Sequence, residues 1–401
     1  MNQSNTDERF HALDALRASA LLLGIVLHAT MSFLYGFREM RFPIADVSQS
    51  LLLEVFFFVV HMFRMMLFFL VAGFFARLLF RRLGAGGFIR NRLRRIGLPL
   101  LIFYPLLLPL VVIPIVWAAK QQGMQAGQGP PGGMPPGIPW FHLWFLYLLL
   151  VMYALLLAAR WIATRLDPHG RFRGMLDSAL RAILRWRVAP LALALPIAIV
   201  LYCTPSWAQM GGIPAPLAGF IPSGPSLLGF GSAFLAGWWI HRQQSLFDFL
   251  RRDWKSYLAA AVTATVFVLC LVGVRSHFMP LVMSMEKRAL YALAYTLGIW
   301  CWVLGLAGAA LAWCSAPSAR WRYLSDASYW MYLVHVPIVW SLQAWMMRWP
   351  LHWTVKFTLI LLIAGTLLLA SYHYLVRSTF LGKLLNGRKY PRSFPLTPVT
   401  T

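Results

Sequence analysis

Long apolar runs, separated by short polar segments, recur along the whole of this 401-residue chain. Runs near 20 residues are long enough to cross the hydrocarbon core of a bilayer as α-helices. Hydropathy predicts ten such spans, at residues 13–35, 51–79, 97–119, 141–162, 188–204, 224–240, 256–274, 288–312, 325–346 and 353–376. We therefore expect an all-α polytopic membrane protein. Its bundle of about ten transmembrane helices, at 13–376, would lie between an N-terminal tail at 1–12 and a basic tail at 377–401.

The composition agrees with a membrane protein, and the distribution of charge orients it. Hydrophobic residues make up 60% of the chain and charged residues 12%, about half the charged share of a soluble domain. If the N-terminus is cytoplasmic, 27 of the 36 Lys and Arg residues fall in inner segments and eight in outer loops. The positive-inside rule therefore predicts that both termini are cytoplasmic. The net charge of +24 then serves topology and contact with anionic lipid, and we expect no nucleic-acid partner.

The cysteines lack the paired spacing of a metal site or of a disulfide framework. They fall in or beside apolar spans, as Cys203, Cys270, Cys301 and Cys314. We therefore expect packing roles for them, and we expect no metal ion and no bound cofactor.

Two outer segments stand out by composition. The Gly- and Pro-rich segment 121–139 predicts a linker, with a flap over an external site as the alternative. Trp207, in the outer loop at 204–225, is a candidate interfacial anchor.

Ionisable side chains inside predicted spans are costly and are functional candidates by default. The first span contains "DALRASALLLGIVLH", in which Asp14, Arg17 and His28 share one helical face. The rise of a helix separates Arg17 and His28 by roughly 16 Å. Arg17 can extend to the headgroups, whereas His28 lies too deep to do so. His28 is therefore a functional candidate, with a buried structural hydrogen bond as the alternative.

The second span places Glu54, His61 and Arg64 along one side of a helix. Arg64 lies at about the same depth as His28. A buried guanidinium needs an anionic partner, which could be Glu54 or a carboxylate of a substrate. An internal Arg64–Glu54 ion pair with a purely structural role is the alternative.

Arginines and aromatic residues near the ends of later segments add further candidates. Arg92 and Arg95, in the inner loop 81–99, can present two guanidinium forks to phosphate, or can anchor the loop to lipid headgroups. His142 and Trp144, at the outer end of the fourth span, can stack on sugar rings. An aromatic belt is the alternative, and it is favoured for Trp140.

The ninth span pairs two candidate residues beside a proline. Tyr332 and His335 are one helical turn apart, and Pro337 leaves the carbonyl of Leu333 without its usual amide donor. The pair predicts a wall of the site, and a histidine satisfied in the core is the alternative.

These motifs together resemble the acyltransferase-3 family of integral membrane acyltransferases. Arg17 and His28, with ten residues between them, look like its signature. The segments "HMFRMMLFFLVAGFF", "RLRRIGLP", "HLWFL" and "ASYWMYLVHVP" look like its subgroup that modifies osmoregulated periplasmic glucans, and the resemblance runs from Leu13 to about Arg377. Ala72 departs from the wider family, which often has Ser-Gly-Phe at this point, so no role is carried over to Ala72.

The resemblance implies a multi-pass enzyme of the bacterial inner membrane. It would transfer a succinyl group from succinyl-CoA, acting as a co-substrate, to hydroxyls of a periplasmic glucan. His28 and Arg17 would be the essential histidine and arginine, and Arg92 and Arg95 would match the cytoplasmic arginine pair that binds CoA. Beside these assignments, we expect Asp14, Tyr332 and His335 in the catalytic set, and an acyl- and glucan-binding group of Glu54, His61, Arg64, His142 and Trp144.

The same residues can be argued from the chemistry. Acylation of a sugar hydroxyl needs a general base, and histidine is the usual one. The oxyanion needs hydrogen-bond donors, which Arg64 or Tyr332 could supply. Two alternatives remain open: an O-acetyltransferase of another surface polysaccharide, and a glycan transporter or exporter that performs no chemistry. A homo-oligomer is compatible with each.

Overall fold

The computed structural model describes residues 10–125, 137–185 and 187–391. In these residues the α-helices are α1 (His11–Thr30), α2 (Tyr35–Glu39), α3 (Leu51–Arg92), α4 (Leu98–Gln121), α5 (Trp144–Leu166), α6 (Arg171–Arg185), α7 (Ala189–Tyr202), α8 (Gly224–Arg242), α9 (Leu246–Val272), α10 (Met285–Trp313), α11 (Ala319–Met346), α12 (Trp353–Ser371) and α13 (Phe380–Asn386). Short 3₁₀ turns lie at Met31–Phe33, Phe141–Leu143 and Gln209–Gly211, and π-helical turns lie at Leu93–Gly97 and Tyr372–Val376. Most of the predicted linker 121–139 and most of both predicted tails lie outside the described residues.

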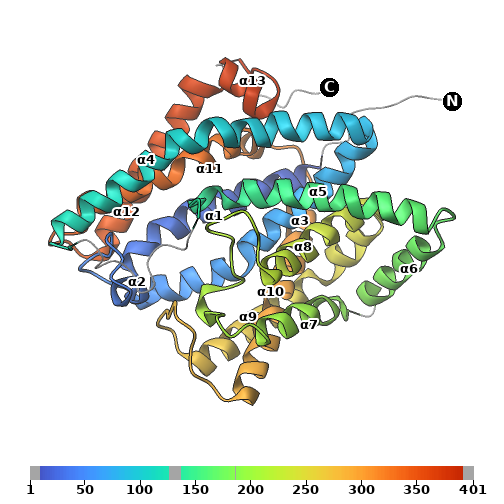
Figure 1. Cartoon of the computed structure of the whole chain (residues 1–401), viewed down its shortest axis with the longest axis horizontal. Helices are drawn as coiled ribbons and strands as arrows, with labels where there is room; N and C mark the ends of the chain where they lie inside the picture. Colours follow the sequence, from blue (N-terminus) through green and yellow to red (C-terminus); the bar gives the residue numbers. More distant parts are fainter. Residues whose placement is uncertain (1–9, 126–136, 186, 392–401) are drawn as a thin grey trace.

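Each of the ten predicted apolar spans is occupied by a helix, and the all-α polytopic class is confirmed. Six helical stretches in the described residues are long and apolar enough to cross a membrane, and the bent α6–α7 pair raises the number to seven. One of these stretches, Leu51–Gln121, has 71 residues, and the chain in Figure 1 doubles back within it, where Gly84 breaks the helical geometry of α3. The number of ten spans and the cytoplasmic position of both termini stay predictions.

Helix α3 extends beyond the predicted span at 51–79. It starts at the cap Ser50, whose side chain accepts a hydrogen bond from the Leu53 amide, and it continues to Arg92. Hydropathy falls at the arginines that follow Leu79, but arginine and leucine are good helix formers, so the helix persists. Gly84 then breaks the helical geometry with a φ of 66°, a conformation that glycine adopts without strain. The stretch that starts at Leu51 therefore ends within a few residues of the predicted end of the span at 79, and Gly84 separates it from the stretch that runs to Arg92.

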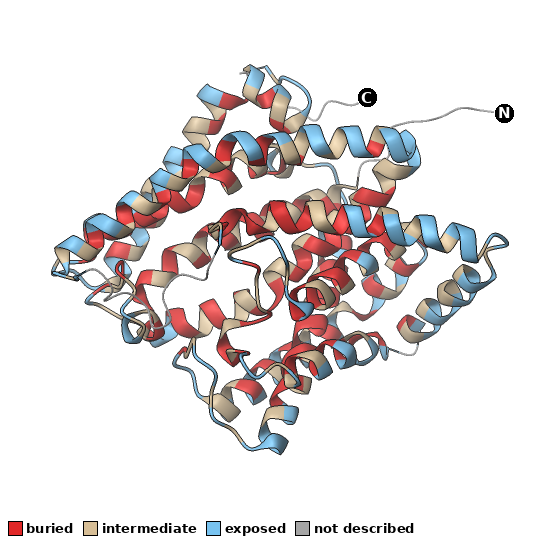
Figure 2. Ribbon diagram, viewed as in Figure 1, coloured by how far each residue is buried: buried red, intermediate tan, exposed pale blue. Residues whose placement is uncertain are grey.

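Helices α1 and α10 belong to the most buried of the candidate spans in the described residues, and Figure 2 shows buried residues concentrated in the middle of the bundle. Helix α1 packs against α11, α3 and α10. Helices α3 and α8 cross closely because glycines meet there. A Cβ atom on Gly73 would collide with the carbonyl of Phe234, and one on Gly237 would collide with the carbonyl of Leu70. Small residues permit such close crossing in membranes, so Gly73 has a packing role.

Two tryptophans differ from their predicted positions at the lipid interface. Trp207 is 0% exposed, and its Nε1 donates to the carbonyl of Gly212 at 2.9 Å, so the prediction of an interfacial anchor is wrong. Trp140 is buried and stacks on Tyr147 with ring centroids 4.9 Å apart, which is not the position of a belt residue. In both cases the outer loops fold over the ring and remove it from the lipid.

Candidate active site

A cavity of about 1370 Å³ runs between α1, α3, α5 and α11. Arg82, Arg92 and Arg95 line one end, which we predict to be cytoplasmic. Residues of the outer segments, among them Phe42 and Ala218, line the other end. Most of the residues that line the cavity are apolar, so its few polar residues are the candidates for binding and chemistry.

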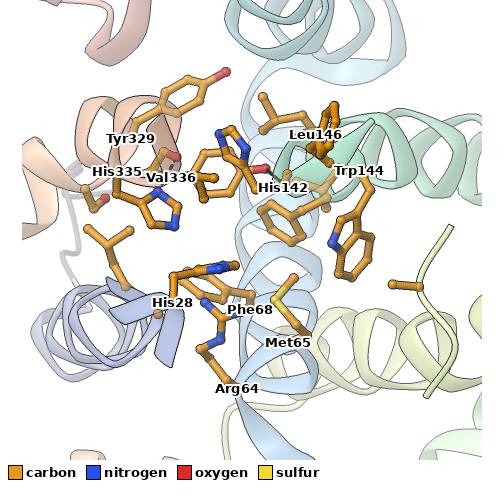
Figure 3. Close-up of a pocket in the computed structure, with 18 of the residues that line it drawn as sticks. His28, Arg64, Met65, Phe68, His142, Trp144, Leu146, Tyr329, His335 and Val336 are labelled. Atoms are coloured by element: carbon orange, nitrogen blue, oxygen red, sulfur yellow. Dashed lines mark hydrogen bonds between the residues drawn. The ribbon is translucent and has the colours of Figure 1, made fainter. Parts of the chain in front are cut away.

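The polar residues at the middle of the cavity form a cluster around His335. The ring centroids of His28 and His335 are 5.0 Å apart, and those of His142 and His335 are 5.4 Å apart. Figure 3 shows these three rings facing one another from α1, α11 and the start of α5, with Arg64 of α3 beside His28. The structure thus brings together four of the predicted site residues from four separate segments.

Hydrogen bonds with main-chain carbonyls fix which ring nitrogens carry hydrogen in two of these histidines. His335 Nδ1 lies 2.7 Å from the carbonyl oxygen of Tyr332, and His142 Nε2 lies 2.9 Å from that of Leu333. A carbonyl only accepts, so both of these nitrogens donate and the other nitrogen of each ring keeps its lone pair. The carbonyl of Leu333 is the one that Pro337 frees, and His142 supplies the missing donor.

His28 is held at both its ring and its main chain. Its Nδ1 lies 3.2 Å from the sulfur of Met31. Since a thioether only accepts, Nδ1 carries the hydrogen in this contact and Nε2 keeps the lone pair. The amide of Gln343, on α11, donates to the carbonyls of His28 and Ala29 at 3.0 and 2.9 Å. The ring is therefore oriented, and in the neutral imidazole Nε2 is the nitrogen suited to accept a proton.

Arg64 reaches the face of α1 one turn before His28. A Cβ atom at Gly24 would collide with Nη1 of Arg64, so the absence of a side chain at Gly24 makes room for the guanidinium. Arg64 Nε has no hydrogen-bond partner among the described residues. The Tyr332 hydroxyl, the other predicted oxyanion donor, donates to the carbonyl of His142 at 2.5 Å. Arg64 is thus the better placed of the two to meet a ligand.

An ion pair between Glu54 and Arg64, one of the two alternatives that the sequence leaves open, is not formed in the structure. The Glu54 carboxylate accepts hydrogen bonds from the amides of Tyr35 at 2.6 Å and Ser276 at 2.9 Å. It does not line the cavity. The Glu54 carboxylate instead joins the outer segments at Tyr35 and Ser276 to α3. Arg64 therefore has no carboxylate partner in the described residues.

His61 lines the cavity but is tied to the outer loop. Its Nε2 donates to the carbonyl of Gly211 at 2.9 Å, and its Nδ1 has no partner among the described residues. The bond holds the loop 204–225 against the outer part of the cavity, where Ala215 and Ala218 also form the wall.

Arg17 and Asp14 meet through a residue on α11 that the sequence did not reveal. Arg17 Nη2 donates to the carbonyl of Ser325 at 2.9 Å and also to its hydroxyl. The Ser325 hydroxyl in turn donates to Asp14 Oδ1 at 3.1 Å, which lies 3.9 Å from Arg17 Nη2. Asp14 therefore contacts Arg17 both directly and through Ser325, and Arg17 lines the cavity between its inner end and His28.

The remaining predicted residues also line the cavity. Arg92, at the end of α3, packs its guanidinium over the rings of Phe88 and Tyr153, 5.6 and 5.4 Å from their centroids. Arg95 lies in the π-helical turn, where its carbonyl accepts from the Tyr329 hydroxyl at 2.8 Å. Trp144 lies at the opposite side, 5.2 Å from Phe230 between ring centroids.

Sequence reasoning missed Gly24, Ser325 and Gln343. Gln343 is a polar residue inside an apolar span, which is a usable signal. Gly24 lies four residues before His28, so it shares the polar face of the first span. Ser325 carries no such signal, because serine is common at helix starts and its partners come from a helix some 300 residues away in sequence.

The structure places these residues together independently of any relative, and comparison with known proteins then identifies the family. A family model described as "Acyltransferase domain" matches residues 10–374. The chain belongs to this acyltransferase family. The resemblance to acyltransferase-3 proteins is thereby confirmed, and the acyltransferase match together with the long apolar helices makes it a multi-pass protein of the bacterial inner membrane.

Curated relatives of this acyltransferase family member include "Glucans biosynthesis protein C" of Escherichia coli (strain SMS-3-5 / SECEC) and of Shigella boydii serotype 4 (strain Sb227). Each is 32% identical over 167 residues, which is 40% of this chain and 40% of the relative. The match therefore spans less than half the length of these relatives. No solved structure matches the chain significantly.

Substituting Gly24 by alanine tests whether the position of Arg64 matters. The added methyl group would displace the guanidinium from α1, while alanine favours the helix by about 1 kcal/mol over glycine. We expect a fall in acyl transfer of at least about tenfold, the scale of 1.4 kcal/mol in an activation free energy, with no loss of protein in the membrane. The measurement is the rate of transfer in proteoliposomes. Gly365→Ala is the matched control, because a Cβ atom there meets nothing within 4 Å.

Proposed function

We propose that this protein transfers a succinyl group from cytoplasmic succinyl-CoA to hydroxyl groups of a periplasmic glucan. One observation carries the proposal: a single cavity joins Arg92 and Arg95, at its predicted cytoplasmic end, to the histidine cluster and Arg64. Membership of an acyltransferase family supports acyl transfer. The name of the curated relatives supports a glucan as the acceptor.

The donor would enter from the end of the cavity that the two arginines line. Guanidinium forks match the geometry of phosphate oxygens, which the CoA nucleotide carries. The thioester arm would then lie along the apolar wall toward His28. The cavity volume of about 1370 Å³ exceeds the range of roughly 300–1,000 Å³ typical of small-ligand pockets, so it has room for a long donor and a sugar together.

The reaction needs only groups that the cavity holds. His28 Nε2, which keeps its lone pair, takes the proton from a glucan hydroxyl as its oxygen attacks the thioester carbonyl. The negative charge on the carbonyl oxygen develops beside Arg64. Collapse of the intermediate forms the ester C–O bond and breaks the C–S bond. The CoA thiolate leaves and takes the proton back from His28, so CoA departs as the thiol.

Assays with labelled donors test the proposal. We expect purified protein in liposomes to transfer label from succinyl-CoA to a glucan as an alkali-labile ester. Label from acetyl-CoA alone would remove the succinyl assignment and leave an acetyltransferase. Mass spectrometry of cell glucans with and without the gene provides the second arm. Loss of an ester on deletion is expected, whereas unchanged glucan substituents would contradict an enzyme and favour a transporter.

Removing the arginine pair tests the site proposed for CoA. We expect Arg92→Gln/Arg95→Gln to raise the KM for succinyl-CoA by at least about 100-fold, because each lost charged hydrogen bond is worth about 1.5–3 kcal/mol and the variant loses one from each arginine. Arg90→Gln/Arg94→Gln is the matched control, since both residues are exposed in the same segment and do not line the cavity. Equal effects of the two double variants would identify the cluster as a general membrane anchor.

A further inference from the structure

A second hollow of about 400 Å³ adjoins the outer end of the main cavity. Phe42 lines both spaces, and the hollow is otherwise enclosed by the turn after α2, the end of α4 and the end of α11. The side chain of Gln122, just after α4, fixes this wall by donating to the carbonyl of Pro43 at 2.7 Å. A ligand that reaches the main cavity from outside therefore passes directly beside the hollow.

Three arginines line this hollow: Arg38, Arg41 and Arg348. Arg348 Nη1 donates to the carbonyl of Gln121 at 2.7 Å, and a guanidinium has five N–H donors, so most of its donors stay available. The amide of Arg41 donates to the carbonyl of Arg38 at 2.9 Å, and its guanidinium makes no hydrogen bond or ion pair among the described residues. Arg41 is held at a φ of 52°, a left-handed conformation that is rare outside glycine and that concentrates at ligand sites.

The positive charge of these arginines is not cancelled by the hollow's own wall. Asp46 is the one acid among the lining residues. Its Oδ1 lies 2.6 Å from Nζ of Lys356, and the two side chains are 2% and 0% exposed. Because this ion pair is closed within the protein, Asp46 does not neutralise the arginines.

The membrane topology does not explain why three arginines line this hollow. The positive-inside rule explains basic residues on the cytoplasmic side and disfavours them outside. The outer segments hold eight of the 36 Lys and Arg residues, and three of these eight lie in this one hollow. A shared anionic ligand explains such a gathering.

We propose that the hollow is a second acceptor subsite, which binds the carboxylates of succinyl groups already attached to the glucan. This inference rests on the proposed function. Each proposed transfer leaves a half-ester that ends in one carboxylate, and arginine forks bind carboxylates through paired hydrogen bonds. A neutral glucan offers no charged group to these arginines. The subsite would therefore retain a partly modified chain beside the cavity and favour further substitution of that chain.

Binding of defined oligoglucans tests the subsite without any turnover. The probes are a neutral oligoglucan, the same oligoglucan succinylated chemically, and free succinate. We expect wild-type protein to bind the succinylated chain at least tenfold more tightly than the neutral one. Arg41→Gln should reduce this ratio, and Arg41→Gln/Arg348→Gln should bring it to about one. Arg275→Gln is the matched control, because Arg275 is an exposed outer arginine whose guanidinium packs on Tyr35, away from the hollow.

Turnover provides a second, separate readout. With wild-type protein, mass spectrometry should show multiply succinylated chains while neutral chains remain, and the double variant should shift the product to singly succinylated chains. Equal binding of neutral and succinylated chains by wild-type protein would overturn the subsite, even if transfer proceeds. So would a ratio that the arginine variants leave unchanged, or binding of free succinate as tight as that of the succinylated chain. Failure of wild-type protein to transfer succinyl would overturn the proposed function, and the binding ratio would still decide the subsite.

Discussion

Substitution of His28 by alanine should lower the rate of acyl transfer by about 10²- to 10⁴-fold, the usual contribution of a general base. The reason lies in the ring nitrogens. Nδ1 faces the sulfur of Met31 at 3.2 Å, so Nε2 has the lone pair that accepts a proton from the glucan hydroxyl. No other side chain on α1 lies at this point of the cavity with a lone pair on nitrogen.

The His28→Ala protein should remain folded and inserted. Gln343 holds this end of α1 through the main-chain carbonyls of His28 and Ala29, and these bonds do not need the imidazole. The measurements are transfer in proteoliposomes, the amount of protein in the membrane and its elution as a monodisperse species in detergent. Retention of more than about a tenth of the activity, a difference of under 1.4 kcal/mol in the barrier, would show that His28 is structural.

His335→Gln separates the two neighbouring histidines. His335 donates through Nδ1 to its own helix at the Tyr332 carbonyl, and its ring is 2% exposed. Both histidines line the cavity, and the bond of His335 to its own helix orients its ring within the cluster. A variant of His335 as inactive as His28→Ala would assign the base to the pair rather than to His28.

The fold was largely predictable because a bilayer restricts the alternatives. A chain cannot leave backbone amides unsatisfied in hydrocarbon, so an apolar run of sufficient length forms a helix. This is why a helix occupies every predicted span, from 13–35 to 353–376. The same reasoning does not locate the polar helix that follows the break at Gly84 and runs to Arg92, because hydropathy detects only the segments that lie in lipid.

The sequence predicted which individual residues belong to the site, but not which residues contact one another. Helical phase correctly placed Asp14, Arg17 and His28 on one face of α1, and all but Asp14 of these line the cavity. It left two candidate partners for Arg64, Glu54 and a carboxylate of a substrate, and the structure does not form the pair with Glu54. The amides of Tyr35 and Ser276 occupy the Glu54 carboxylate, and they come from loops that no periodicity within α3 can locate. Hydrogen-bond partners that come from other segments could therefore not be predicted from the sequence.

Arg64 has no ion pair with Glu54, so its guanidinium is available to a ligand, and its substitution is the second change for which we expect a large effect. We expect Arg64→Gln to lower kcat/KM for succinyl-CoA by about 10²- to 10³-fold, the usual result of removing one oxyanion donor. Gln keeps a polar side chain, which is shorter than that of arginine, and removes the charge. The guanidinium lies against Gly24, one turn from His28, which is where the carbonyl oxygen of a thioester attacked beside His28 would lie.

The choice of donor distinguishes the two roles that Arg64 can have. Butyryl-CoA matches succinyl-CoA in chain length and lacks its distal carboxylate. If Arg64 stabilises the oxyanion, the ratio of variant to wild-type kcat/KM should be the same for both donors, because both form the same oxyanion. If Arg64 binds the distal carboxylate, the ratio should fall only for succinyl-CoA. A variant within about threefold of wild type with both donors, a change of under 1 kcal/mol, would remove Arg64 from the reaction and leave the oxyanion to be stabilised elsewhere.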